Sequence, residues 1–121
     1  MIRLTEAEWA VLQVLWEKGP CPLGDIVSEL EKSRRWRRNT VHTYLTRMEG
    51  KGLVGIARGE EPHLYGAAVE KELCIREARS AFLETVYSGA AGDLIAAFLK
   101  ESKLTSKEKA RLRDLLDQME V

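Results

Sequence analysis

The 121-residue chain is poor in the residues that build reactive or cross-linked sites, with two cysteines, two histidines and three prolines. Cys21 and Cys74 lie far apart and belong to no CxxC or cysteine–histidine spacing, which indicates separate buried or half-buried thiols. His42 and His63 have no aspartate or cysteine at the spacing of a triad or zinc site. No glycine-rich phosphate loop follows a predicted strand. The sequence therefore predicts no enzyme, metal, cofactor or small-molecule substrate.

A long apolar run and an excess of one charge are also missing. No stretch approaches the ~20 apolar residues that span a bilayer, and no secretory signal opens the chain, so we expect a cytoplasmic protein. The 19 basic and 19 acidic residues give zero net charge. That sum hides a local excess, because eight Lys or Arg and one acidic residue, Glu49, lie between Lys32 and Arg58. Phosphate binding depends on such a patch and not on the global charge.

The basic stretch contains a predicted helix with one apolar side. Val41, Leu45 and Met48 are spaced at i, i+4 and i+7, which places them on one buried side. Gly52 follows as a stop signal, since glycine readily takes the left-handed conformation that ends helices. The polar residues on the outer side or at the opening turn are Asn39, Thr40, Thr43 and Arg47.

These polar side chains suit base recognition in DNA. Asparagine can pair bidentately with adenine and arginine with guanine, and a threonine methyl can contact the thymine methyl. Around them lie the predicted phosphate contacts, which are Arg34, Arg35, Arg37, Arg38, His42 and Arg58. Taken alone, the arginine run is equally consistent with a solvated loop, but its place before a helix and a hairpin favours DNA. Trp36 within it is interpreted as a small core anchor and not as a base-stacking residue.

Around the basic helix, the pattern is typical of a winged helix-turn-helix unit. Thr5 and Glu8 form a capping box, which predicts a helix start. The elements expected in order are a helix to about residue 18, a helix over 23–32, the basic helix, and strands over 53–58 and 63–67. Three short helices followed by a hairpin predict a winged-helix DNA-binding domain over residues 1–69.

The remaining residues, 70–121, are predicted to form a helical dimerisation domain. Helices are expected over about 70–87 and 93–100, and a second capping box at Thr105 and Glu108 opens a last one. Their apolar stripes are wide for a three-helix core folded alone, so we infer that they pack against a second copy. The alternative is packing on their own N-terminal unit. The predicted dimer contacts are Ile75, Ala78, Phe82, Val86, Leu94, Phe98, Leu112, Leu115, Leu116 and Met119.

Several segments together resemble one known family. The segments 4–9 (LTEAEW), 14–16 (VLW), 39–48 (NTVHTYLTRM) and 51–54 (KGLV) are similar to the penicillinase-repressor (BlaI/MecI/CopY) family. The resemblance continues through Phe82, Gly89 and the predicted helix at 94–98, and so covers nearly the whole chain. The combination of two tryptophans in the first predicted helix with the later T-V-x-T-x-L-x-R block is far more specific than a bare winged-helix pattern.

The resemblance implies a homodimeric transcriptional repressor that binds a palindromic operator through its third helix. Members often control β-lactamase or related resistance genes, and a membrane sensor-protease pathway inactivates such members by cutting the dimerisation region. The matching bond is Ala97–Phe98, where members commonly have asparagine before the phenylalanine. Members also commonly have Ser or Thr and then Pro at the positions of Arg37 and Arg38. The C-terminal cysteine motif of the copper-responsive branch is missing, which disfavours copper sensing.

The alternative function is a winged-helix protein-interaction module without sequence-specific DNA binding. It predicts acidic or bulky apolar residues on the outer side of the third helix. The sequence instead places short polar groups and an arginine there.

Overall fold

The computed structural model describes residues 2–119 and confirms a mainly helical fold with a small antiparallel sheet after the N-terminal helices. The chain forms two compact units, Met1–Ala78 and Arg79–Val121. The division between them falls inside one helix, whereas the sequence prediction divided the chain after residue 69. The elements in chain order are α1 (Glu6–Lys18), β1 (Cys21–Pro22), α2 (Leu23–Arg34), α3 (Arg38–Gly50), β2 (Val54–Ala57), β3 (Leu64–Ala67), α4 (Lys71–Tyr87), α5 (Ala91–Glu101) and α6 (Ser106–Gln118).

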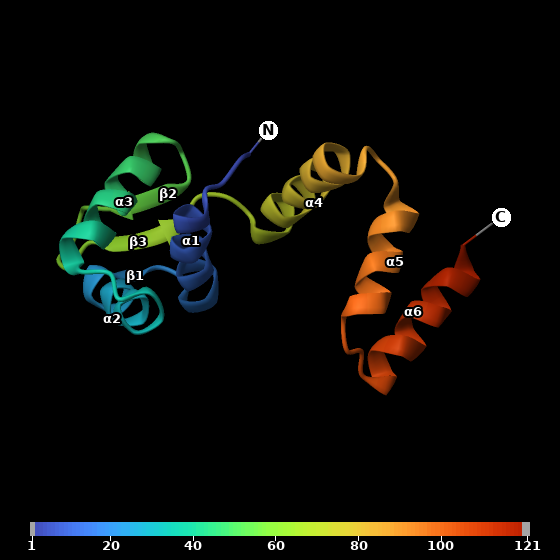
Figure 1. Ribbon diagram of the computed structural model, residues 1–121. Helices are drawn as coiled ribbons and strands as arrows, with labels where there is room; N and C mark the ends of the chain where they lie inside the picture. Colours follow the sequence, from blue (N-terminus) through green and yellow to red (C-terminus); the bar gives the residue numbers. More distant parts are fainter. Residues whose placement is uncertain (1, 120–121) are drawn as a thin grey trace. The chain divides into compact units, whose positions relative to one another are not determined.

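In the N-terminal unit, α1, α2 and α3 surround the small sheet (Figure 1). The strands are antiparallel in the order β1-β3-β2, with Cys21 opposite Tyr65 and Gly55 opposite Gly66. The hairpin of β2 and β3 confirms the predicted wing. Nothing in the sequence predicts β1, because its two residues look only like a proline-rich break after α1. As an edge strand, β1 tolerates the proline that lacks a backbone N–H.

Local capping chemistry fixes where α1 begins. The backbone N–H of Glu8 donates to Thr5 Oγ1 at 3.2 Å, and the Thr5 N–H donates to Glu8 Oε1 at 2.9 Å. This reciprocal pair is the predicted capping box, which satisfies two amide groups at the helix N-terminus. α3 differs, because its N-cap residue Arg37 makes no side-chain capping hydrogen bond. Gly52 has φ +78°, which confirms it as the residue where the chain leaves α3.

The core of this unit lies between the helices and the sheet. Val41, Leu45 and Met48 are fully buried, so the predicted underside of α3 is confirmed. Trp16 Nε1 donates to the Val69 carbonyl at 2.9 Å and thereby fixes the segment that precedes α4. The other fully or almost fully buried side chains of α1 and α2 are Val11, Leu12, Leu15, Ile26 and Leu30.

The C-terminal unit contains the second half of α4 with α5 and α6. Thr105 and Glu108 form the predicted second capping box, with reciprocal hydrogen bonds of 3.1 and 3.0 Å. α5 begins at Ala91 and so includes Gly92, which the sequence pattern had suggested as part of the break; the positive φ values lie earlier, at Ser88 and Gly89. No residue of α5 or α6 within their described bounds is buried. Among residues 2–119, no single helix is long and apolar enough to cross a membrane.

The predicted dimer contacts divide between the two units. Ile75 is half-buried and Ala78 exposed, and both belong to the N-terminal unit. Leu94 and Leu112 are half-buried in the C-terminal unit. The remaining six are large apolar side chains that are exposed in the single chain, namely Phe82, Val86, Phe98, Leu115, Leu116 and Met119.

Candidate nucleic-acid interface

The outer side of α3 presents the four residues predicted to contact bases. Asn39, Thr40, Thr43 and Arg47 are all exposed, and together with Tyr44 they line a shallow hollow of about 250 Å³. The buried underside of the same helix orients this face toward solvent. The structure therefore brings all four predicted residues onto one accessible helix surface.

The hydroxyl of Thr43 is already engaged within the helix. Its Oγ1 donates to the Asn39 carbonyl at 2.8 Å, and Thr46 Oγ1 donates in the same way to His42 at 3.0 Å. Such bonds to the carbonyl four residues earlier use the hydroxyl proton. Thr43 is thus left with its methyl group and an acceptor oxygen for a ligand, which suits contact with a thymine methyl.

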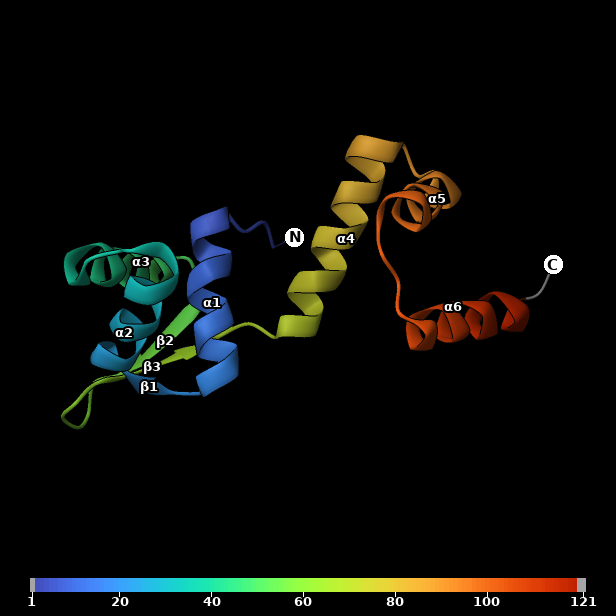
Figure 2. The same ribbon diagram turned by 60° about the horizontal axis from the view of Figure 1, so that its bottom comes forward.

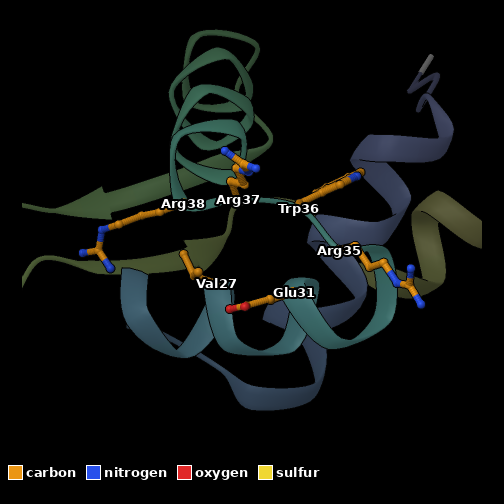
Figure 3. Close-up of a pocket in the computed structure, with 6 residues that line it drawn as sticks. All are labelled: Val27, Glu31, Arg35, Trp36, Arg37 and Arg38. Atoms are coloured by element: carbon orange, nitrogen blue, oxygen red, sulfur yellow. The ribbon is translucent and has the colours of Figure 1, made fainter.

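The N-terminal end of α3 borders a second, larger hollow of about 500 Å³ (Figure 3). In Figure 3, Arg37 and Arg38 lie at the start of α3, above Val27 and Glu31 of α2, and Arg35 points away from Arg38. The first turn of α3 has no side-chain cap, so its backbone amides and the positive end of the helix dipole add to the arginine charges. These charges and amides favour an anion at this end of α3, and phosphate contact by Arg37 and Arg38 stays a prediction.

The loop that carries these arginines is held by Trp36 and by the end of α2. Trp36 stacks on Tyr44 of α3, with ring centroids 5.0 Å apart and planes 28° apart. It is half-buried and packs against the hydrophobic core, in agreement with its interpretation as an anchor. Arg35 adopts the left-handed conformation at φ 58°, where α2 ends. Consequently α3 begins only at Arg38, and the arginine run forms a connecting loop between two helices.

Carboxylates of the same chain form ion pairs with some of the basic residues of the patch. Arg34 pairs with Glu6 at 3.0 Å, Lys51 with Glu8 at 2.8 Å, and Arg58 with Glu49. The basic residues from 32 to 58 that form no ion pair with a carboxylate of residues 2–119 are Lys32, Arg35, Arg37, Arg38 and Arg47. His42 is exposed on α3. The unpaired positive charges therefore lie at the end of α2, at the start of α3 and at Arg47.

Glu8 connects this interface to the core. Its side chain is 5% exposed, and it accepts hydrogen bonds from the Thr5 backbone and from Lys51 Nζ, just after α3. Burial acts to raise the pKa of Glu8, but the bonds from Lys51 and Thr5 outweigh it, so the pKa lies below its usual value. The Glu8 carboxylate thereby fixes the C-terminal end of α3 to the N-terminus of α1. Sequence reasoning missed this role, because Glu8 looks like an ordinary capping-box residue.

We expect Glu8→Gln to lower the free energy of unfolding by about 1–2 kcal/mol near neutral pH, because a neutral amide keeps the cap but loses the charged bond to Lys51. The folded-state pKa is depressed, so this stabilisation is present above the usual carboxylate pKa and is lost as the pH falls through the lowered value. The unfolding curves of the two proteins should therefore converge in acid. Denaturant titrations from about pH 7 down to about pH 3 measure this, with Glu6→Gln as an exposed control expected to change stability by less than about 0.5 kcal/mol. A constant difference across the pH range would contradict the role of the carboxylate charge.

The two cysteines of the N-terminal unit line neither of the two hollows. Cys21 and Cys74 are both buried and form no disulfide. Burial raises the pKa of both thiols, and neighbouring Asp25 and Glu77 raise them further, which disfavours the reactive thiolate. Among residues 2–119, no group of three or more His, Cys, Asp or Glu side chains is placed to hold a metal.

Comparison with known proteins identifies the family. Residues 4–118 match the family model described as Penicillinase repressor. The chain belongs to the penicillinase-repressor family. As a member it is a DNA-binding transcriptional repressor and not an enzyme.

Individual members of the penicillinase-repressor family align with this chain over almost its full length. It is 27% identical to the penicillinase repressor of Staphylococcus aureus, over 96% of this chain and 92% of that protein. It is 26% identical to the methicillin resistance regulatory protein MecI of Mammaliicoccus sciuri, over 94% of this chain and 93% of that protein. The solution structure of monomeric Bacillus licheniformis BlaI in complex with the blaP half-operator superposes with a TM-score of 0.53 at 22% identity, covering 59% of this chain and 87% of that one. That superposition supports the fold.

Proposed function

We propose that the protein is a homodimeric repressor in which α3 of each copy enters the major groove of one half of a palindromic operator. The observation that carries this proposal is the two-sided character of α3. Its underside is fully buried, while Asn39, Thr40, Thr43 and Arg47 form an exposed polar face beside a concentration of unpaired arginines. A helix of this width fits the major groove, where each base pair presents a distinct pattern of donors and acceptors.

Dimerisation would place two such faces on one operator. Support comes from the C-terminal unit, where α5 and α6 have no buried residue and large apolar side chains remain exposed. Exposed apolar area of this kind favours association with another surface. A two-fold dimer reads a palindrome with half-site centres one helical turn, or a multiple of it, apart. A cytoplasmic location, where such a repressor would meet chromosomal DNA, is part of this proposal.

We further propose that the regulated genes are of the β-lactamase or related resistance type and that a membrane sensor-protease pathway releases the repressor by cleavage at Ala97–Phe98. This bond lies inside α5, which has no buried residue in the single chain. In the proposed dimer the partner would cover Phe98, so cleavage requires that the copies separate or that the helix opens locally, and proteases cut such opened segments. Ala97 stands where cleaved relatives commonly have asparagine, so a sensor protease for this chain would have to accept alanine.

The proposal is tested by selecting duplexes from a random-sequence pool with the full-length wild-type chain. We expect enrichment of a palindrome whose half-sites are about 10 base pairs apart or a multiple of that. Binding without enrichment of any sequence would contradict the proposal and favour the interaction-module alternative.

Arg47→Ala is expected to cost about 1–3 kcal/mol on the selected duplex and to relax the preference at one base pair of each half-site, because an arginine fork pairs bidentately with guanine. Repeating the selection with the variant locates that position. Lys32→Ala serves as the control, since Lys32 belongs to α2 and its replacement removes one positive charge without changing a residue of α3. An equal loss for Arg47→Ala on every sequence would show that Arg47 contacts phosphate instead of a base.

A further inference from the structure

The wing carries little positive charge of its own. Arg58 is the single Lys or Arg between Gly52 and Glu70, and it is followed by Glu60 and Glu61. The loop between β2 and β3 that contains these glutamates extends beyond the sheet (Figure 2). Glu61 pairs with His63 at 3.3 Å, and Glu60 is exposed. A phosphate that approached this loop would meet the negative charges of Glu60 and Glu61, and Arg58 is the single Lys or Arg that could attract it.

Arg58 is already engaged by α3. Its Nη2 donates to Glu49 Oε1 at 2.9 Å and its Nη1 donates to Glu49 Oε2, which is the two-pronged geometry of an arginine–carboxylate pair. The hydrogen bond and the opposite charge lower the pKa of Glu49 and raise that of Arg58, so both stay charged near neutral pH. Glu49 is the one acidic residue of the basic stretch, and it lies in the last turn of α3.

The ion pair between Arg58 and Glu49 connects the end of α3 with the end of β2, the first strand of the wing. After α3, the Leu53 N–H donates to the Met48 carbonyl at 2.9 Å, and β2 then runs from Val54 to Ala57. Arg58 follows β2 directly, and its side chain forms the ion pair with Glu49 in α3. The start of β2 is therefore fixed by a backbone bond and its end by the ion pair, which sets the direction in which the wing leaves α3.

We propose that Arg58 is a wing-positioning residue that acts through Glu49, and that it is not a phosphate contact. This inference rests on the proposed DNA-binding function. The pair has no net charge, so releasing Arg58 to a phosphate would leave Glu49 unpaired beside the DNA backbone. Phosphate attraction then comes from the N-terminal end of α3, and the wing contributes by fixing how the helix meets the groove. The sequence analysis predicted a phosphate contact for Arg58, which stays untested, and we propose this role in its place.

Arginine-to-lysine substitution separates the two roles, because lysine keeps the charge but cannot reproduce the planar two-pronged bond. The test uses full-length protein and measures affinity for the duplex selected by the wild-type chain and for random-sequence duplex, over a series of salt concentrations. For Arg58→Lys, Arg58→Gln and Glu49→Gln, we expect the ratio of selected to random affinity to fall about twofold to fivefold, the scale of a well-formed exposed ion pair. The double variant with Glu49→Gln and Arg58→Gln should lose no more than either single variant.

Glu60→Gln is the matched control, because it removes one negative charge from the wing without touching the pair, and it should leave the ratio unchanged. The salt slope of Arg58→Gln on random duplex should also match that of the wild-type chain. The proposal is overturned if Arg58→Lys behaves like wild type while Arg58→Gln lowers the slope by about 0.9 for each N-terminal unit bound, since that is the signature of a phosphate contact. It is also overturned if Glu49→Gln tightens binding and keeps the ratio. A wild-type chain that selects no sequence would instead refute the proposed function itself.

Discussion

Operator binding by the full-length chain is expected to weaken by about 10³–10⁵-fold as salt rises from about 50 to 200 mM. Apart from Arg47, which we assign to base reading, each N-terminal unit presents four basic residues without an internal ion pair in the described chain. The proposed dimer presents eight, namely two copies each of Lys32, Arg35, Arg37 and Arg38. If each neutralises one phosphate, the slope of log affinity against log salt has an upper limit of about −7. A titration on the selected duplex measures it.

Two arginine variants test whether internal pairing decides which cations contribute. Replacing both Arg37 and Arg38 with glutamine removes four charges from the dimer, and the slope should become shallower by about 3.6. Arg34→Gln is the matched control, because Arg34 is already neutralised by Glu6 and should leave the slope nearly unchanged. If Arg34→Gln alters the slope as much per residue as the Arg37 and Arg38 changes do, the ion pairs of the free protein do not decide which cations meet DNA.

The local features of the fold could be predicted from the sequence because they depend on residues close together in the chain. Both capping boxes involve residues three positions apart, and the buried underside of α3 follows from helical spacing alone. The opening turn expected at Asn39 also lies next to the observed start of α3 at Arg38. The end of the preceding helix was expected at about residue 32, whereas α2 runs to Arg34 and ends where Arg35 adopts the left-handed conformation.

Features that depend on distant pairings were not predictable. β1 exists only because Cys21 and Pro22 meet Tyr65 and Leu64 of β3, more than 40 positions away. The same limit applies to the charges of the interface. A count along the sequence gives eight basic residues from 32 to 58, yet Lys51 is paired with Glu8 across 43 positions. The sequence thus located the basic patch, and the tertiary structure divides it into paired and unpaired cations.

Leu116→Asp is expected to convert the homodimer that we propose into monomers and to weaken binding to the palindromic duplex by about 100-fold or more, because the two N-terminal units then lose their linkage. Leu116 is 56% exposed in the single chain, so the change should not remove packing from the core of either unit. It would, however, place an unpaired carboxylate in the apolar surface that we propose is covered by the partner. Analytical ultracentrifugation measures the association, and titration of palindromic and half-site duplexes measures the binding.

Ala110→Asp gives the matched control for this change. It adds the same charge to α6, but helical spacing places Ala110 on the side opposite Leu112, Leu115 and Leu116, and its position is exposed. We expect this variant to remain dimeric and to bind the palindrome as the wild-type chain does. Affinity for an isolated half-site should be the same for both variants, since each head keeps its α3 and its arginines. If Leu116→Asp stays dimeric with full operator affinity, the apolar side of α6 is not the interface, and the packing of these helices on their own chain becomes the better explanation of their exposed stripes.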